Sequence, residues 1–265
     1  MQLNEPQTAT NYLDVGKGDE ARSIAYRHVP ASVPAATGVF WLSGFMSDMG
    51  STKANAVVAW AAERQLPSTV FDYSGHGLSS SKFTDGTIGR WLDEAIAVFT
   101  TITRGPQIII GSSMGGHIAL LMLRSLAKDF PEHAARIKGA VLIAPAWDMT
   151  EELMWKQFPE AARRALRDDG VYLRASDYAD PYPITRQLIE DGRNHLLARQ
   201  PFDPGCPIVI LQGLLDTAVP APHTRELLSF LIGQNIRLVE IADGEHRLSR
   251  PEDLGKLYDA IASLI

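Results

Sequence analysis

The stretch from Ile108 to His117, IIIGSSMGGH, constrains the fold of this chain more than any other feature. An apolar run of isoleucines ends at Gly111, and an apolar pattern with helical spacing follows. Gly111-x-Ser113-x-Gly115 matches the G-x-S-x-G pattern, in which a strand turns sharply into a helix and holds one serine at the tip. Side chains two residues before or after that serine would collide with neighbouring backbone, so both positions are glycine. We therefore expect a strand, a strained turn and a helix here.

Short apolar runs alternate along the chain with stretches of helical spacing. The predicted strands cover residues 22–29, 37–42, 68–71, 108–110, 137–143, 207–211 and 236–241. The predicted helices begin near residues 51, 87, 118, 222 and 251, and the fourth of them extends to residue 232. Regular alternation of strands and helices is typical of a parallel sheet with helices on both faces. The predicted fold class is therefore α/β, with a mostly parallel central sheet.

The alternation breaks between residues 147 and 204, a segment rich in charge that contains no convincing strand. Helices are expected there over residues 151–168 and 184–197. The simplest domain organisation is a core made of residues 1–146 and 205–265, with residues 147–204 inserted as a helical cap.

Composition limits the functions open to this chain. The 265 residues carry a formal net charge of −6 without a basic stripe, which argues against a nucleic-acid or anionic-membrane partner. One cysteine, Cys206, permits no internal disulfide and fits a reducing compartment. No apolar run approaches the roughly 18–20 residues of a membrane helix, and the first residues lack the apolar core of a signal peptide. We therefore expect a cytoplasmic protein. We also expect no cofactor, and no metal in particular, because no cluster of His, Cys and Asp residues has the spacing of metal ligands.

A serine hydroxyl is a weak nucleophile at neutral pH, so it needs a base, and the base needs an orienting carboxylate. Functional side chains on parallel sheets gather at the carboxyl ends of the strands. Asp216 and His246 each follow a predicted strand, in the chain order serine, acid, histidine. His76, in a glycine-punctuated loop after another strand, is the rival base. The predicted catalytic residues are Ser113, Asp216 and His246.

The oxyanion formed when a serine attacks a carbonyl needs hydrogen-bond donors. The expected donors are the backbone N–H of Met114, directly after the serine, and that of Phe45, in the loop after the 37–42 strand. Gly44 lets this loop turn. Ser112 is not the predicted nucleophile, because Ile110 and Met114 stand where its flanking glycines would be.

Together these motifs resemble the α/β-hydrolase family over nearly the whole chain. The segments that carry the resemblance are Ser43–Met46, Asp72–Ser79, Gly111–Gly115, Gly213–Pro220 and His246. A more specific likeness is to the group of acyl-glucuronide esterases and palmitoyl-protein thioesterases with their bacterial relatives. It rests on Phe45–Met49, Thr52–Ala54, Phe71–Gly75 and Gly111–Gly116. The resemblance implies hydrolysis of acyl esters or thioesters. Ser43 stands where many members carry histidine, a residue that the N–H donors of this loop do not require.

Large apolar side chains gather at the start of the expected cap and are candidates for an acyl pocket. They are Trp147, Met149, Met154, Trp155 and Phe158. The alternative is that they pack the cap onto the sheet. Four arginines, at positions 163, 164, 167 and 174, are candidates to contact an anionic leaving group. The alternative for these arginines is a solvated helix face, because acidic residues are interleaved with them.

The sequence predicts a serine hydrolase that acts on small-molecule acyl esters or thioesters through an acyl-enzyme intermediate. A serine peptidase of the same fold would use the same three residues and stays as an alternative. A non-catalytic ligand-binding receptor is a second alternative, disfavoured because none of the three residues is missing. A dehalogenase is disfavoured because its nucleophile would be a carboxylate.

Overall fold

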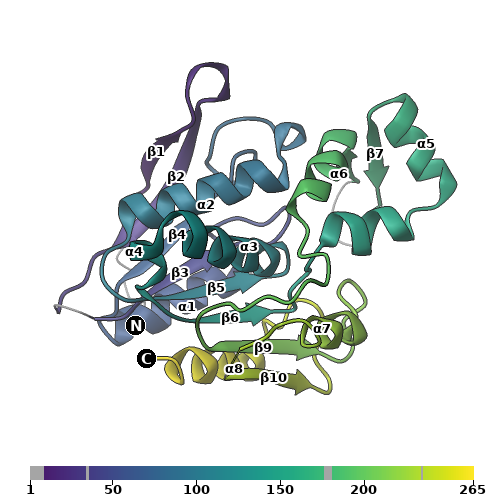
Figure 1. Ribbon diagram of the computed structural model, residues 1–265. Coiled ribbons are helices and arrows are strands. Elements are labelled where there is room, and N and C mark those ends of the chain that lie inside the picture. The colour runs from purple at the N-terminus through teal and green to yellow at the C-terminus, as the bar shows by residue number, and fades with distance from the viewer. Residues whose placement is uncertain (1–8, 34–35, 176–180, 234) are drawn as a thin grey trace, which may run out of the picture.

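The computed structural model describes residues 9–33, 36–175, 181–233 and 235–265. An eight-stranded sheet runs through the molecule in the order β1-β2-β4-β3-β5-β6-β9-β10 (Figure 1). From β4 to β10 neighbouring strands are parallel, whereas β2 is antiparallel to both β1 and β4. The strands are β1 Asn11–Val15, β2 Arg22–Val29, β3 Gly38–Leu42, β4 Ser68–Phe71, β5 Gln107–Ser112, β6 Ile137–Ile143, β9 Ile208–Gly213 and β10 Ile236–Ile241.

Helices cover both faces of this sheet. One face packs against α1 (Thr52–Glu63) and α8 (Pro251–Ala262), and the other packs against α2 (Ile88–Ile102) and α3 (Met114–Asp129). The isoleucines of β5 serve both layers, since successive side chains of a strand point to opposite faces. Ile109 joins the cluster on the α2 and α3 side, and its two isoleucine neighbours join the other. Short helices α4 (Pro131–Ala134) and α7 (Ala221–Leu227) complete the core.

Two predictions for the core were wrong in detail. The expected strands did not include β1, an edge strand with only Val15 buried, which forms by pairing with β2 rather than by an apolar pattern. The helix expected over residues 222–232 ends at Leu227. Beyond Leu227 the chain pairs with the segment around Phe202, which precedes β9. The Ile232 N–H donates to the Phe202 carbonyl oxygen at 2.9 Å.

The segment between residues 147 and 204 differs more from the prediction. It contains a two-stranded hairpin, β7 (Val171–Arg174) and β8 (Tyr182–Thr185), where no strand was expected. The helix expected over residues 151–168 is broken: a π-helical turn Thr150–Met154 and a 3-10 turn Trp155–Gln157 precede α5 (Glu160–Asp168). Proline at position 159 has no N–H to continue the helix, so a new one starts after it.

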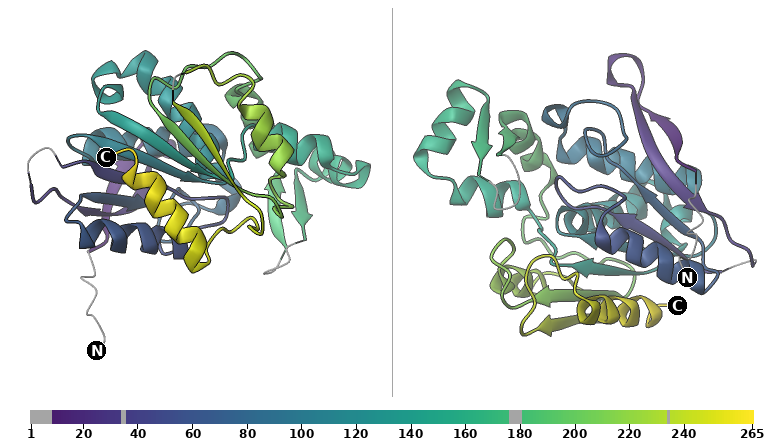
Figure 2. Two further views of the ribbon diagram at one scale, coloured as in Figure 1. Left: turned by 90° about the horizontal axis from the view of Figure 1, so that it is seen from below. Right: turned by 180° about the vertical axis from the view of Figure 1, so that it is seen from behind.

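The second helix expected in this segment is also shorter than predicted. Helix α6 spans Arg186–Gly192 and is followed by a 3-10 turn, Arg193–His195. Thr185 caps α6, since its side chain accepts a hydrogen bond from the Leu188 N–H at 3.1 Å. The chain leaves the core after β6 and returns to it at β9, and Figures 1 and 2 show α5, β7 and α6 projecting at one side of the core.

Two further kinds of feature are absent from the described residues. None of their helices is long and apolar enough to cross a bilayer. No group of three or more of their His, Cys, Asp or Glu side chains is arranged to hold a metal ion.

Candidate active site

Ser113 stands at the tip of a strained turn between β5 and α3. Its backbone has a φ of 54° and a ψ of −116°, outside the regions that residues with side chains normally adopt. A Cβ on Gly111 would lie 2.3 Å from the Gly115 carbonyl oxygen. A Cβ on Gly115 would lie 2.1 Å from the Leu42 carbonyl oxygen. Both glycines are therefore required for the turn to fit beside β3.

Three side chains from distant parts of the chain meet at this turn. The Ser113 Oγ lies 3.1 Å from His246 Nε2, and His246 Nδ1 lies 2.8 Å from Asp216 Oδ2. Asp216 follows β9 and His246 follows β10, two adjacent parallel strands. The Asp216 side chain is fully buried, whereas 31% of the His246 side chain is exposed. Because an ionised carboxylate only accepts, Nδ1 donates to it and leaves Nε2 free to accept the serine proton.

Asp216 is held in place by its own loop and by a buried amide. Its Oδ1 accepts hydrogen bonds from the Ala218 and Val219 N–H groups at 2.9 and 2.8 Å. Gln212 is fully buried, donates to the Val219 carbonyl oxygen at 3.0 Å and accepts from the Thr224 hydroxyl at 2.6 Å. The sequence-based prediction does not include Gln212. The sequence feature that could have indicated Gln212 is a single amide side chain at the end of an otherwise apolar predicted strand.

The loop after β3 turns back beside the serine. The Ser47 N–H donates to the Gly44 carbonyl oxygen at 3.1 Å and closes a β-turn. A Cβ on Gly44 would lie 3.4 Å from the Cβ of Ser113, so this turn lies directly against the serine. Within the part of the chain that the structure describes, neither the Phe45 N–H nor the Met114 N–H has a hydrogen-bond acceptor. Both N–H groups are therefore available to a bound molecule.

Comparison with known proteins places this geometry in a family. The Hydrolase_4 family model, described as "Serine aminopeptidase, S33", matches residues 34–191. The chain belongs to the Hydrolase_4 family of α/β hydrolases. The predicted α/β-hydrolase fold and the predicted family resemblance are confirmed.

Individual relatives agree with this assignment. Human palmitoyl-protein thioesterase ABHD10, a mitochondrial protein, is 26% identical over 245 residues, which are 92% of this chain and 76% of that protein. A crystal structure from Agrobacterium vitis is described in general terms as that of a hydrolase. This protein is 39% identical to the chain, and the two structures have a TM-score of 0.94. That comparison covers 97% of this chain and 98% of the other. Mouse α/β hydrolase domain-containing protein 10 has a TM-score of 0.81 at 24% identity, over 97% and 98% of the two chains, and shares the fold.

In this α/β hydrolase, the rival base His76 is committed to backbone groups. Its Nδ1 lies 3.1 Å from the Ser74 carbonyl oxygen, and its Nε2 lies 3.2 Å from the Met46 backbone nitrogen. Neither ring nitrogen is directed at the serine, so His76 is not placed to take its proton.

The apolar residues at the start of the 147–204 segment pack into the protein. The buried or half-buried side chains are Trp147, Met149, Met154, Trp155 and Phe158. Trp147 stacks on His223 with ring centroids 4.4 Å apart and donates from Nε1 to the His223 carbonyl oxygen at 2.8 Å. The segment leaves the core beside the serine, since the Ala146 N–H donates to the Ser113 carbonyl oxygen at 3.1 Å. A role for these residues in an acyl pocket stays a prediction.

Three of the four arginines singled out in the sequence lie on α5. Arg163 donates to the Trp155 carbonyl oxygen at 3.0 Å and lies over its ring, and Arg167 pairs with Glu160. Arg164 is exposed. Arg164 and Arg167 therefore agree with a solvated helix face, whereas Arg163 packs against Trp155.

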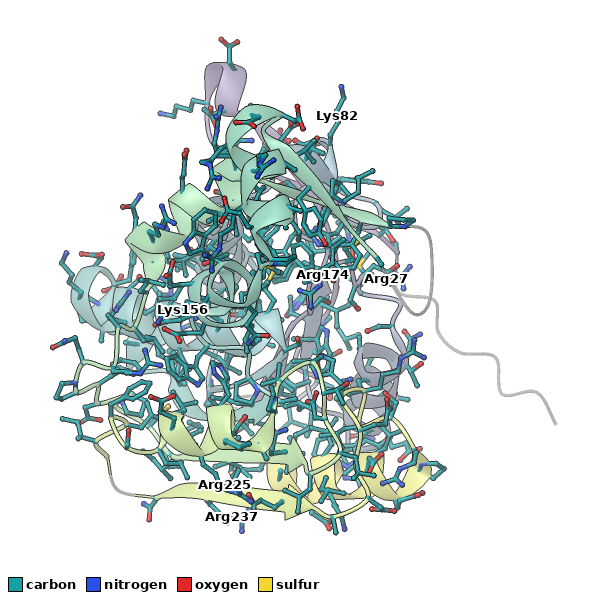
Figure 3. All side chains as sticks on the ribbon, turned by 90° about the vertical axis from the view of Figure 1, so that its right-hand side faces the viewer. Arg27, Lys82, Lys156, Arg174, Arg225 and Arg237 are labelled. Carbon is teal, nitrogen blue, oxygen red and sulfur yellow. The ribbon has the colours of Figure 1, made fainter. Side chains whose placement is uncertain are left out.

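Arg174 is placed differently. It lies on β7 opposite Tyr182, and directly opposite residues of an antiparallel pair point to the same face. The Tyr182 ring is 5.8 Å from the Phe45 ring in an edge-on contact, so this face is turned toward the loop after β3. Figure 3 labels Arg174 near the middle of this side of the molecule, well above Arg225 and Arg237.

Lys53 links helix α1 to the loop that contains His246. Its Nζ donates a hydrogen bond to the carbonyl oxygen of Arg247, the residue after His246. Burial lowers the pKa of Lys53 to about 8, against the opposing effect of the Glu245 carboxylate. The sequence carries no signal for this contact, because the two residues lie far apart in the chain.

Proposed function

We propose that this α/β hydrolase is a serine hydrolase that cleaves carboxylic esters or thioesters through an acyl-enzyme intermediate. The observation that carries the proposal is the continuous hydrogen-bonded chain from Ser113 through His246 to Asp216. The relatives described as a thioesterase and a hydrolase support the choice of acyl chemistry. An arrangement of this kind activates a serine without a metal or cofactor.

In the first half-reaction, the Ser113 Oγ attacks the acyl carbonyl carbon while His246 Nε2 takes the hydroxyl proton. The buried Asp216 carboxylate holds the ring in the required tautomer and stabilises the imidazolium. The Phe45 and Met114 N–H groups donate to the oxyanion of the tetrahedral intermediate, and one such donor is typically worth about 10²–10³ in rate. His246 then returns the proton to the leaving oxygen or sulfur.

In the second half-reaction, water replaces the leaving group. His246 removes a proton from the water as its oxygen attacks the acyl carbon, and the same two N–H groups bind the new oxyanion. The intermediate collapses, the ester bond to Ser113 breaks, and the hydroxyl regains a proton from His246. The products are the free acid and the restored enzyme.

We infer that the 147–204 segment acts as a cap over the serine. Its entry point beside Ser113 and the contact between Tyr182 and Phe45 support this role. The apolar side chains proposed to form the acyl pocket are Trp147, Met149, Met154, Trp155 and Phe158.

A fluorophosphonate probe tests the nucleophile, since it reacts covalently with activated serines. We expect labelling of the wild type and of Ser112→Ala, and none of Ser113→Ala, each measured by intact-protein mass spectrometry with folding checked by circular dichroism. Ser112 is the matched control because it is the neighbouring serine without flanking glycines on both sides. Equal labelling of Ser113→Ala would overturn the assignment.

A substrate series tests the reaction class. We expect turnover of p-nitrophenyl esters of increasing chain length, of acyl-CoA or of an acyl glucuronide, and loss of all turnover in Ser113→Ala. Hydrolysis confined to aminoacyl p-nitroanilides would indicate a peptidase instead. Binding of esters without turnover would indicate a receptor.

A further inference from the structure

His76 lies outside the catalytic triad but is buried beside it. The residue is only 6% exposed and follows β4 in the loop that contains Ser74. Its ring makes edge-on contacts with Phe83 and Trp91, with centroids 5.2 and 5.3 Å away. Such a position is unusual for a histidine unless both ring nitrogens have partners.

The two partners of His76 fix its protonation state. The Ser74 carbonyl oxygen can only accept, so the nitrogen beside it, Nδ1, must carry a proton. The Met46 backbone N–H can only donate, so the nitrogen beside it, Nε2, must be bare. Burial lowers the pKa of His76, against the opposing effects of the Ser74 hydrogen bond and the Asp48 charge, and so favours this neutral ring.

Met46 is the residue that makes the Gly44–Ser47 turn unusual. Its φ is 56°, in the left-handed region, although it is not glycine. Half of its side chain is exposed, so packing of that side chain does not account for the conformation. In addition to the Ser47–Gly44 hydrogen bond that closes the turn, the hydrogen bond from the Met46 N–H to His76 Nε2 holds this peptide group in place.

The peptide group held by His76 joins Met46 to Phe45, whose N–H is the proposed oxyanion donor. The Phe45 ring is fixed by the same two aromatic side chains that surround His76, at centroid distances of 5.0 Å to Phe83 and 5.9 Å to Trp91. The ring and the following peptide bond of Phe45 are therefore both tied to one buried cluster. With its ring and its carbonyl-side peptide group both held, Phe45 has little freedom to move its own N–H relative to the neighbouring serine.

We propose that His76, in its neutral form with the proton on Nδ1, is a positioning residue that aims the Phe45 N–H at the reacting carbonyl oxygen. This inference rests on the proposed function, because it needs an oxyanion to be stabilised. His76 does not touch the substrate and transfers no proton. It acts through the Met46 N–H, which only an acceptor at this place can hold.

The test compares His76→Phe, which keeps the ring volume without an acceptor, with His76→Gln, whose amide oxygen can accept from Met46 and whose N–H₂ can donate to Ser74. We expect kcat of His76→Phe to fall about 10²-fold with KM changed less than about twofold, the size of losing one oxyanion donor. His76→Gln should recover kcat to within about fivefold of the wild type. The matched control is His133→Phe, the same replacement at a more exposed histidine away from the site.

The outcomes separate this inference from the proposed function. Full activity of Ser113→Ala would overturn the proposed function itself. An inactive Ser113→Ala with kcat of His76→Phe near the wild type, or with His76→Gln as slow as His76→Phe, would overturn the role of His76 alone. If His76→Phe does not fold, nitrogen-15 NMR of the wild-type histidines decides. We expect a bare Nε2 and a protonated Nδ1 on His76, and the opposite tautomer would overturn the inference.

Discussion

The core loops around Ser113 and the neighbouring 147–204 segment are held in place by different means. In the core, backbone approaches backbone so closely that a Cβ on Gly115 would lie 2.1 Å from a carbonyl oxygen. The 147–204 segment is closed at its base by side chains: Arg199 pairs with Glu152, and the buried Asp148 carboxylate binds backbone N–H groups. Asp148 accepts hydrogen bonds from the N–H groups of Leu197 and Ala198 at 2.7 and 2.9 Å, which joins the two ends of the segment.

Under the proposed function, this difference separates the chemistry from the selection of substrate. Contacts between backbone atoms leave no room for a larger side chain, so the turn that holds Ser113 keeps one geometry. Contacts made by side chains can change one at a time. We therefore expect substitutions at the backbone contacts around Ser113 to abolish folding or catalysis, and substitutions in the 147–204 segment to change its attachment or the choice of substrate.

The largest effect is expected for Gly115→Ala, because the new methyl group would overlap the Leu42 carbonyl oxygen. Thermal or urea unfolding should show a loss of more than about 4 kcal/mol, or no folded protein. Gly255→Ala on α8 is the matched control, since nothing lies within 4 Å of its added Cβ. It should raise stability by about 0.5–1 kcal/mol through helix propensity. Equal stability of the two variants would contradict the backbone-contact argument.

A smaller effect is expected for Asp148→Ala, which removes both hydrogen bonds at the base of the segment. The loss should be about 2–4 kcal/mol, because the buried Leu197 N–H and the partly buried Ala198 N–H lose a charged acceptor. Limited proteolysis should cut first within residues 147–204 while the core persists. Asp148→Asn keeps one acceptor oxygen and tolerates the φ of 49°, so it should be cut at an intermediate rate. Cleavage at the wild-type rate in Asp148→Ala would show that the carboxylate does not hold the segment.

A pH-dependent effect is expected from His117, a fully buried residue of α3 that accepts from the Asp148 N–H at 3.3 Å. Burial lowers the pKa of His117 from 6.5 to about 3, so between these values the unfolded chain binds a proton that the folded chain does not. The contribution of His117 to stability is therefore complete above pH 6.5 and declines as the pH falls, by up to about 1.4 kcal/mol per pH unit.

The variant His117→Gln removes this titration and keeps an acceptor. The difference in unfolding free energy between the wild type and His117→Gln, measured by urea denaturation from pH 4 to 7, should change in favour of the variant as the pH falls. A difference in unfolding free energy that stays constant over this range would contradict a lowered pKa of His117 in the folded protein.

The smallest effect is expected for Arg174→Gln, at the inner face of the hairpin. If Arg174 attracts an anionic leaving group, the ratio of kcat/KM for an acyl-CoA to that for the neutral acyl-N-acetylcysteamine thioester should fall about fivefold, the size of a partly exposed ion pair. The control Arg164→Gln removes the same charge from an exposed site on α5 and should leave the ratio unchanged. The same fall in both variants would indicate a general field effect rather than a contact.

Much of the core was predictable because its signals are local. The bounds of β2, β4, β6 and β10 agree with the predicted strands, and in the last three apolar or β-branched residues predominate. The hairpin of the 147–204 segment was not predictable in the same way. Its strands have four residues each, and they are stabilised by pairing with one another and by the contact of Tyr182 with Phe45.

The sequence by itself determined the strained serine turn, because glycines at fixed spacing are needed wherever backbones touch. It also determined the order in which serine, acid and histidine follow their strands. Only the tertiary structure decided that the ring of His76 faces a carbonyl oxygen and an N–H group, that Gln212 supports Asp216, and that Lys53 reaches the histidine loop. These contacts join residues that the chain keeps apart, and no local pattern specifies them.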